Sequence, residues 1–119
     1  ERMRANLLLA FSPEYVRTEV AEVDHVVHLR AINDVPEHVY LSQWQAAMSF
    51  DAESRVEQID KPTLVLSGNA DVIVPVQNSR NLAAKIPGAE LRIVEGGSHT
   101  FFIERAAEFN RIVTEFLDS

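Results

Sequence analysis

The 119-residue sequence contains no cysteine, which excludes a disulfide framework, a thiolate nucleophile and any cysteine-ligated metal site. Basic residues are also few: 11 lysines and arginines stand against 18 acidic residues, and the net charge is −7. This acidic balance argues against nucleic acid and anionic membranes as partners. Long apolar runs are missing as well. The longest early one, Leu7 to Phe11, is far shorter than the roughly 18 residues of a membrane span.

The sequence shows no arrangement of basic, apolar and small-residue regions typical of a signal peptide, so the cytoplasm is the default location. Its 46% hydrophobic and 24% charged residues are typical of a globular protein with a buried core. A chain of this length suffices for one domain, but most complete α/β enzymes need more strands. We therefore expect the chain to be a piece of a longer protein.

The first half of the chain has the pattern of helices. Ser12-Pro13-Glu14 predicts a helix start, because serine caps free amides, proline fits the first helical position and glutamate suits the positive end of the helix dipole. The helix that follows has valines at helical spacing, which predict one buried face: Val16, Val20, Val23 and Val27.

A second helix is predicted after the break at Asn33-Asp34 and Pro36. Four of its residues share one face: Tyr40, Trp44, Ala47 and Met48. Such a face belongs to the core about twice as often as to a pocket, and in a helix covering an active site the two roles can coincide. Asp51 then predicts the cap of a third, short helix reaching toward Gln58.

From Ile59 onward the pattern changes to alternating strands and helices. Residues 63–67 form a continuous apolar run, typical of a strand covered on both faces in a parallel sheet. A helix over 77–86 and a second strand over 90–94 follow, with a right-handed crossover expected between the strands. A last helix is indicated by residues spaced four and three apart: Phe102, Ala106, Phe109, Val113 and Phe116.

Each predicted strand leads through a glycine-bearing turn to one ionisable side chain, Asp71 after the first and His99 after the second. Loops at the carboxyl ends of parallel strands converge on one crevice, so we expect these side chains to lie close together. A hydrolytic triad needs a nucleophile, a histidine base and a carboxylate that orients the histidine. We interpret His99 and Asp71 as the last two. The alternative without catalysis is that Asp71 is a turn residue that accepts hydrogen bonds from nearby amides and that His99 is an ordinary loop histidine.

The residues around this pair carry a family resemblance. Pro62-Thr-Leu-Val-Leu-Ser-Gly-Asn-Ala-Asp-Val-Ile-Val-Pro75 resembles the acid segment of the α/β-hydrolase superfamily, in which the acid precedes the histidine. Gly96-Gly-Ser-His-Thr-Phe-Phe-Ile-Glu104 resembles the histidine segment of the same superfamily. Phe109-Asn-Arg with Phe116-Leu117 looks like its terminal helix, so the likeness covers residues 59–119.

Residues 12–58 more loosely resemble the helical cap that the superfamily inserts before its acid-bearing strand, and the whole is most like the enol-lactonase and esterase branch. The resemblance implies an α/β fold class: the C-terminal part of an α/β-hydrolase fold, two parallel strands with helices at 59–119, preceded by a helical cap region at 1–58. It also implies hydrolysis of an ester, lactone or related bond through a Ser-Asp-His type triad. Epoxide and haloalkane chemistry share this scaffold.

The sequence departs from the family pattern at the nucleophile. A Gly-x-Ser-x-Gly elbow, whose glycines permit the strained turn from strand to helix, occurs nowhere. Ser98 lacks the second glycine and stands beside the histidine, a poor geometry for a nucleophile, so Ser67 and Ser98 are interpreted as backbone-bonding turn residues. The chain therefore supplies an acid and a base but no nucleophile, and by itself it is not expected to hydrolyse an ester.

The remaining candidates are weaker. Trp44, Met48 and Phe101 are candidate substrate-binding residues, with Phe101 either walling an acyl pocket or seating the last helix. His25 and His28 have the spacing of a metal pair but no third ligand, so both are interpreted as solvated or core-edge histidines, and no metal or cofactor is expected. The same interpretation applies to His38, and Glu95 and Glu104 are expected at the surface.

A two-stranded piece leaves one edge of the 63–67 strand unpaired, and such edges seek partners. The expected partners are therefore the N-terminal half of the same protein or a second copy of the chain, together with a small-molecule substrate in the complete protein. The competing hypothesis is a non-catalytic hydrolase relic that serves as a dimerisation or interaction module.

Overall fold

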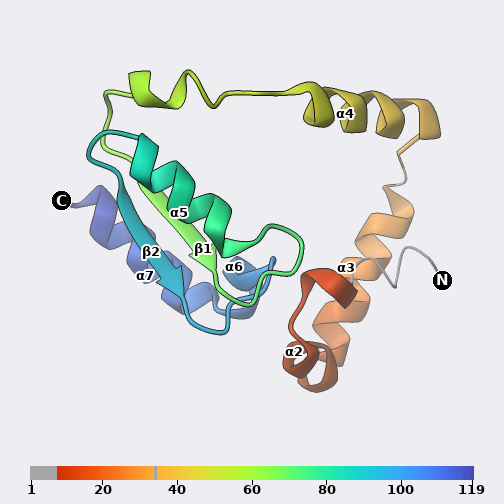
Figure 1. The fold of residues 1–119 in the computed structure, drawn as a ribbon. Helices are drawn as coiled ribbons and strands as arrows, with labels where there is room; N and C mark the ends of the chain where they lie inside the picture. Colours follow the sequence, from red (N-terminus) through yellow and green to blue (C-terminus); the bar gives the residue numbers. More distant parts are fainter. Residues whose placement is uncertain (1–7, 34) are drawn as a thin grey trace.

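The computed structural model describes residues 8–33 and 35–119 of the chain, so Leu7 and Asp34, which figure in the sequence patterns, lie outside the described residues. Its elements are shown in Figure 1. In chain order they are α2 (Pro13–Thr18), α3 (Val20–Ile32), α4 (Glu37–Ser49), the 3-10 helix η1 (Val56–Gln58), β1 (Leu64–Gly68), α5 (Val76–Lys85), β2 (Glu90–Val94), α6 (Phe101–Glu104) and α7 (Ala106–Leu117). None of the helices within this part of the chain combines the length and apolarity of a membrane span.

The two strands form the predicted parallel pair, with Leu64 opposite Glu90 at one end and Gly68 opposite Val94 at the other. Figure 1 shows α5 in front of the strands and α7 behind them, so both faces are covered. The core between these layers includes Val65 and the fully buried Val94. This covering explains the continuous apolar run of β1 and confirms the α/β class.

The first predicted helix begins where expected but is broken. The Ser12 hydroxyl accepts a hydrogen bond from the Tyr15 N–H at 3.2 Å, which caps α2. At Glu19, however, the backbone leaves helical geometry with φ −107° and ψ 48°, and α3 starts anew. The predicted valine face is therefore confirmed only in part: Val23 is buried and Val16 and Val27 are half-buried, whereas Val20, directly after the break, is 52% exposed.

α4 contributes little to the core. Tyr40, Trp44 and Met48 do share this helix, but each is more than half exposed. Figure 1 shows α4 standing apart from the strands and α5. Asp51 caps a turn through its bond from the Glu53 N–H at 2.8 Å, but the expected short helix is reduced to the single 3-10 turn η1.

The last predicted helix is also two helices, because the backbone at Arg105 has φ −126° and ψ 43°. α6 holds Phe101, which is buried against two rings: its centroid lies 6.1 Å from that of Phe102 and 6.0 Å from that of Phe109. This aromatic cluster seats α6 and α7 on each other directly after the β2 loop. The loop that carries His99 therefore leads directly into this aromatic cluster.

Candidate active site

The loops that follow β1 and β2 bring Asp71 and His99 together. Nδ1 of His99 lies 2.9 Å from Oδ2 of Asp71, across 28 residues of sequence. The Asp71 side chain is only 8% exposed, whereas that of His99 is 39% exposed. The carboxylate is thus enclosed and the imidazole reaches outward, which is the order that an orienting acid and a working base require.

Asp71 uses its two oxygens differently. Oδ1 accepts the backbone N–H groups of Ile73 and Val74, each at 2.8 Å, and Oδ2 faces His99. Both interpretations of this residue therefore hold geometrically, the turn aspartate at one oxygen and the histidine partner at the other. The turn also prevents the carboxylate from rotating away from the imidazole.

Burial alone would raise the pKa of Asp71, but the hydrogen bonds from the Val74 N–H, from His99 and from the Ile73 N–H hold this pKa below its ordinary value. The carboxylate is therefore ionised at neutral pH and can only accept. Nδ1 of His99 must then carry the proton that it donates to Asp71, and in the neutral imidazole this tautomer has its lone pair on Nε2. Within the described part of the chain, Nε2 has no hydrogen-bond partner.

Two glycines allow the loops to approach so closely. A Cβ atom on Gly68 would lie 2.2 Å from the carbonyl oxygen of Gly97, so no larger residue fits there unless the loops part. The contact is completed by the Ala70 N–H, which donates to the same carbonyl oxygen at 2.9 Å. The strand-end glycines therefore set the distance between the loop of Asp71 and the loop of His99.

Asn69 fastens the same loops through its side chain. Its Oδ1 accepts the Gly96 N–H at 2.7 Å and its Nδ2 donates to Glu95 at 2.6 Å. Gly96 has φ +68°, a left-handed conformation that favours glycine. Sequence reasoning missed Asn69. The signal that could have revealed its role is its position directly after the strand-end glycine, where an amide side chain can bond a neighbouring loop.

Glu104 was also missed, since it was expected at the surface. The structure contradicts this: the residue is half-buried, and its Oε1 lies 2.6 Å from the Ser98 hydroxyl and 2.7 Å from the Ser12 backbone N–H. Ser98 itself is 3% exposed and accepts the Thr100 N–H, as a turn serine does. A partner 92 positions earlier in the sequence explains why no local pattern revealed this role.

The structure does not bring all three candidate substrate-binding residues close to Asp71 and His99. Phe101 lies two positions after His99 and is buried in the aromatic cluster, whereas Trp44 and Met48 lie exposed on α4. His25, His28 and His38 are exposed on α3 and α4. Among the described residues, no three His, Asp or Glu side chains come close enough to hold a metal.

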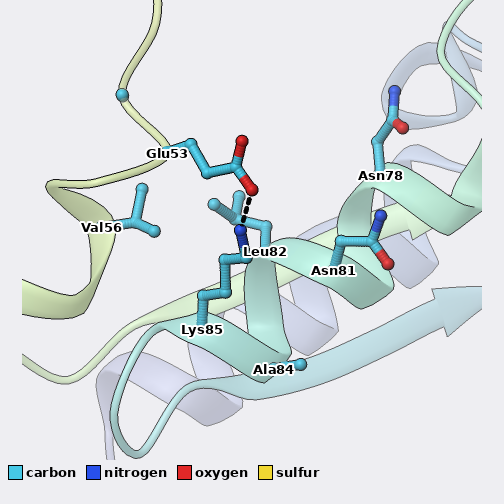
Figure 2. A pocket seen from close by; sticks show the side chains of 8 residues that line it. Glu53, Val56, Asn78, Asn81, Leu82, Ala84 and Lys85 are labelled. Atoms are coloured by element: carbon cyan, nitrogen blue, oxygen red, sulfur yellow. Dashed lines mark hydrogen bonds and ion pairs between the residues drawn. The ribbon is translucent and has the colours of Figure 1, made fainter.

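Three hollows among the described residues are lined by neither Asp71 nor His99. One of about 470 Å³ lies between the segment before η1 and α5. Figure 2 shows Glu53 ion-paired with Lys85 across it, with Asn78 and Asn81 further along α5. Two others lie between α2 and α6 and between α3 and α4.

The Hydrolase_4 family (serine aminopeptidase, S33) matches residues 17–106. Among curated relatives, a candidate carbamate hydrolase, RutD of Caulobacter sp. strain K31, is 36% identical over 107 residues, which are 89% of this chain and 38% of that protein. The chain thus spans well under half the length of such relatives.

Two solved structures share the fold of this chain. The enol-lactonase of Burkholderia xenovorans LB400 superimposes with a TM-score of 0.90 and 28% identity, over 98% of this chain and 44% of the lactonase. A hydrolase from Pseudomonas aeruginosa PA01 superimposes with a TM-score of 0.86 over 99% of this chain and 43% of that one. At 22% identity, the latter likeness concerns the fold alone.

Proposed function

Because this chain belongs to the serine aminopeptidase S33 family of α/β-hydrolases, we propose that Asp71 and His99 are the acid and the base of a hydrolytic triad. The observation that carries this proposal is the 2.9 Å hydrogen bond between His99 Nδ1 and Asp71 Oδ2. It joins the two side chains that follow consecutive parallel strands, in the chain order acid then histidine that α/β-hydrolases use.

The proposed chemistry follows from the tautomer. With its Nδ1 proton donated to Asp71, His99 offers Nε2 to a serine hydroxyl and takes its proton as that oxygen attacks an acyl carbon. The imidazolium that forms faces the ionised carboxylate of Asp71, which stabilises the new positive charge. His99 then returns the proton to the leaving group, and a water molecule repeats the cycle on the acyl-enzyme.

The nucleophile in this proposal is a serine outside the 119 residues, since the sequence contains no Gly-x-Ser-x-Gly elbow. The RutD relative is more than twice as long as the matched segment, which leaves room for the strands that carry an elbow and an oxyanion hole. In this proposal residues 1–58 form the cap region and residues 59–119 the acid and histidine half of the core. The same N-terminal half would cover the part of the His99 side chain that is exposed in this structure.

The proposed substrate class is an ester, a lactone or a related acyl bond. Two named similarities support acyl chemistry: the solved relative is an enol-lactonase and the curated one a candidate carbamate hydrolase. Lactones, esters and carbamates all react through attack on an acyl carbon, and one triad serves each of them. Trp44, Met48 and Phe101 remain the proposed substrate-binding residues.

The test uses the protein expressed from its complete reading frame, assayed with an activated ester and a lactone beside the 119-residue chain. We expect hydrolysis by the complete protein and none by the chain alone. A serine-directed fluorophosphonate should label a serine outside residues 1–119, located by peptide mapping. Absence of hydrolysis and of labelling in the complete protein would overturn the proposal, as would labelling at Ser67 or Ser98.

A further inference from the structure

Glu104 is the point at which two distant segments meet beside the candidate base. Its Oε1 accepts from the Ser98 hydroxyl at 2.6 Å and from the Ser12 backbone N–H at 2.7 Å. Short bonds to a carboxylate are the stronger kind, because the acceptor carries charge. One oxygen atom thus holds both the residue before His99 and the start of α2.

The bonds continue around His99 to its other neighbour. The Ser98 hydroxyl, while donating to Glu104, accepts the Thr100 N–H at 3.1 Å. The Thr100 hydroxyl donates in turn to the Ala10 carbonyl oxygen at 2.8 Å. Ser98 and Thr100 are both buried, so water cannot replace these partners without rearrangement of the loop.

From this network we infer that Glu104 is a positioning residue for His99. Among the described residues its side chain is hydrogen-bonded to Ser12, Ser98 and Thr100 and not to Asp71 or the imidazole. It fixes the two residues that flank His99 and thereby the direction of the side chain toward Asp71. The inference rests on the proposed function, in which this direction matters for proton transfer. The same carboxylate couples the base to residues 10–12, so movement at the start of α2 reaches the histidine loop.

The test follows the downfield proton resonance of His99 Nδ1–H in the complete protein, a signal that reports the bond to Asp71 and requires no turnover. Glu104→Ala and Ser98→Ala should each broaden or abolish it. Glu104→Gln keeps an acceptor oxygen and should retain it. Two controls should also retain it: Ser67→Ala, which removes another buried strand-end hydroxyl, and Ser12→Ala, which removes the α2 cap but not the backbone N–H bonded to Glu104.

In turnover, Glu104→Ala should lower kcat by up to about 10²-fold with KM little changed, as expected when a reacting group is displaced by about 1 Å. A resonance unchanged in Glu104→Ala overturns the inference, even if the melting temperature falls. If that variant does not fold, Ser98→Ala decides in the same way. Equal losses in Glu104→Gln and Glu104→Ala also overturn it. A complete protein with the expected resonances but no hydrolysis would contradict the proposed function and leave the positioning role standing.

Discussion

A Cβ atom on Gly68 would meet the carbonyl oxygen of Gly97 at 2.2 Å, so the separation of the two strand-end loops depends on the absence of a side chain at this position. Asp71 lies three residues after the first of these glycines and His99 two residues after the second. This contact between backbones therefore sets how closely the loop of Asp71 approaches the loop of His99.

We expect Gly68→Ala to destabilise the complete protein by about 1–3 kcal/mol, the usual cost of overpacking, and to reduce activity by separating the loops. Gly88→Ala is the matched control. Gly88 has φ +71°, but no atom of the described residues lies within 4 Å of its Cβ position, so this variant costs only backbone strain, about 1–2 kcal/mol, and should leave activity intact. Urea denaturation and kcat/KM measure the two effects. Equal activity in both variants would contradict the role of the close approach.

Asp71→Asn should reduce kcat by about 10⁴-fold, as loss of the orienting carboxylate does in serine hydrolases, because the amide can present its N–H and so favour the wrong histidine tautomer. Asp51→Asn is the control, since Asp51 also accepts a backbone N–H two residues later but lies far along the chain from the histidine. Hydrolysis of an activated ester measures both. Wild-type turnover by Asp71→Asn would refute the assignment.

The pH dependence of stability follows from the lowered pKa of Asp71. Since the folded pKa lies below the unfolded one, the contribution is fully present above the unfolded value of about 3.9 and is lost as the pH falls through the folded value. Wild-type protein should therefore exceed Asp71→Asn in stability at pH 7, and this difference should shrink as the pH is lowered below 3.9. Urea midpoints across this range measure it. A difference independent of pH would show that the carboxylate charge is not what the Ile73 and Val74 amides and His99 stabilise.

The meeting of Asp71 and His99 could be anticipated because each follows a strand in a repeated strand–helix pattern. Parallel strands bring their carboxyl ends to one edge whatever the details of packing. The strand over 90–94 has the predicted bounds, since Gly88 and Gly96 delimit it on both sides. These features depend on local sequence alone.

The helix breaks at Glu19 and Arg105 could not be anticipated in this way, because neither position carries a proline or glycine to mark it. Glu104 was misjudged for a related reason. A carboxylate one turn into a helix is ordinarily solvated, and only the folded chain brings Ser12 to it from 92 residues away. The contacts at the site that sequence reasoning did not reveal are those between segments far apart in the chain.

The remaining prediction concerns association. Within the described residues, β1 pairs only with β2, so its other edge carries unpaired backbone groups. Apolar side chains on and after α4 are exposed as well, Trp44 to 54%, Met48 to 68% and Phe50 to 70%. We therefore expect the purified 119-residue chain to self-associate, because burying these surfaces in a second copy removes apolar area and open edges from water.

Static light scattering over a range of concentrations measures this, with the complete protein as the control. If, as proposed, an N-terminal half of the same protein covers the β1 edge, the complete protein should expose less surface and associate less than the chain alone. Trp44→Ser with Met48→Ser tests the helix contribution separately and should weaken the association without abolishing it, since the strand edge remains. A 119-residue chain that is monomeric and shows dispersed amide resonances would refute the prediction, because it would show that the open edge and the apolar face are stable in water.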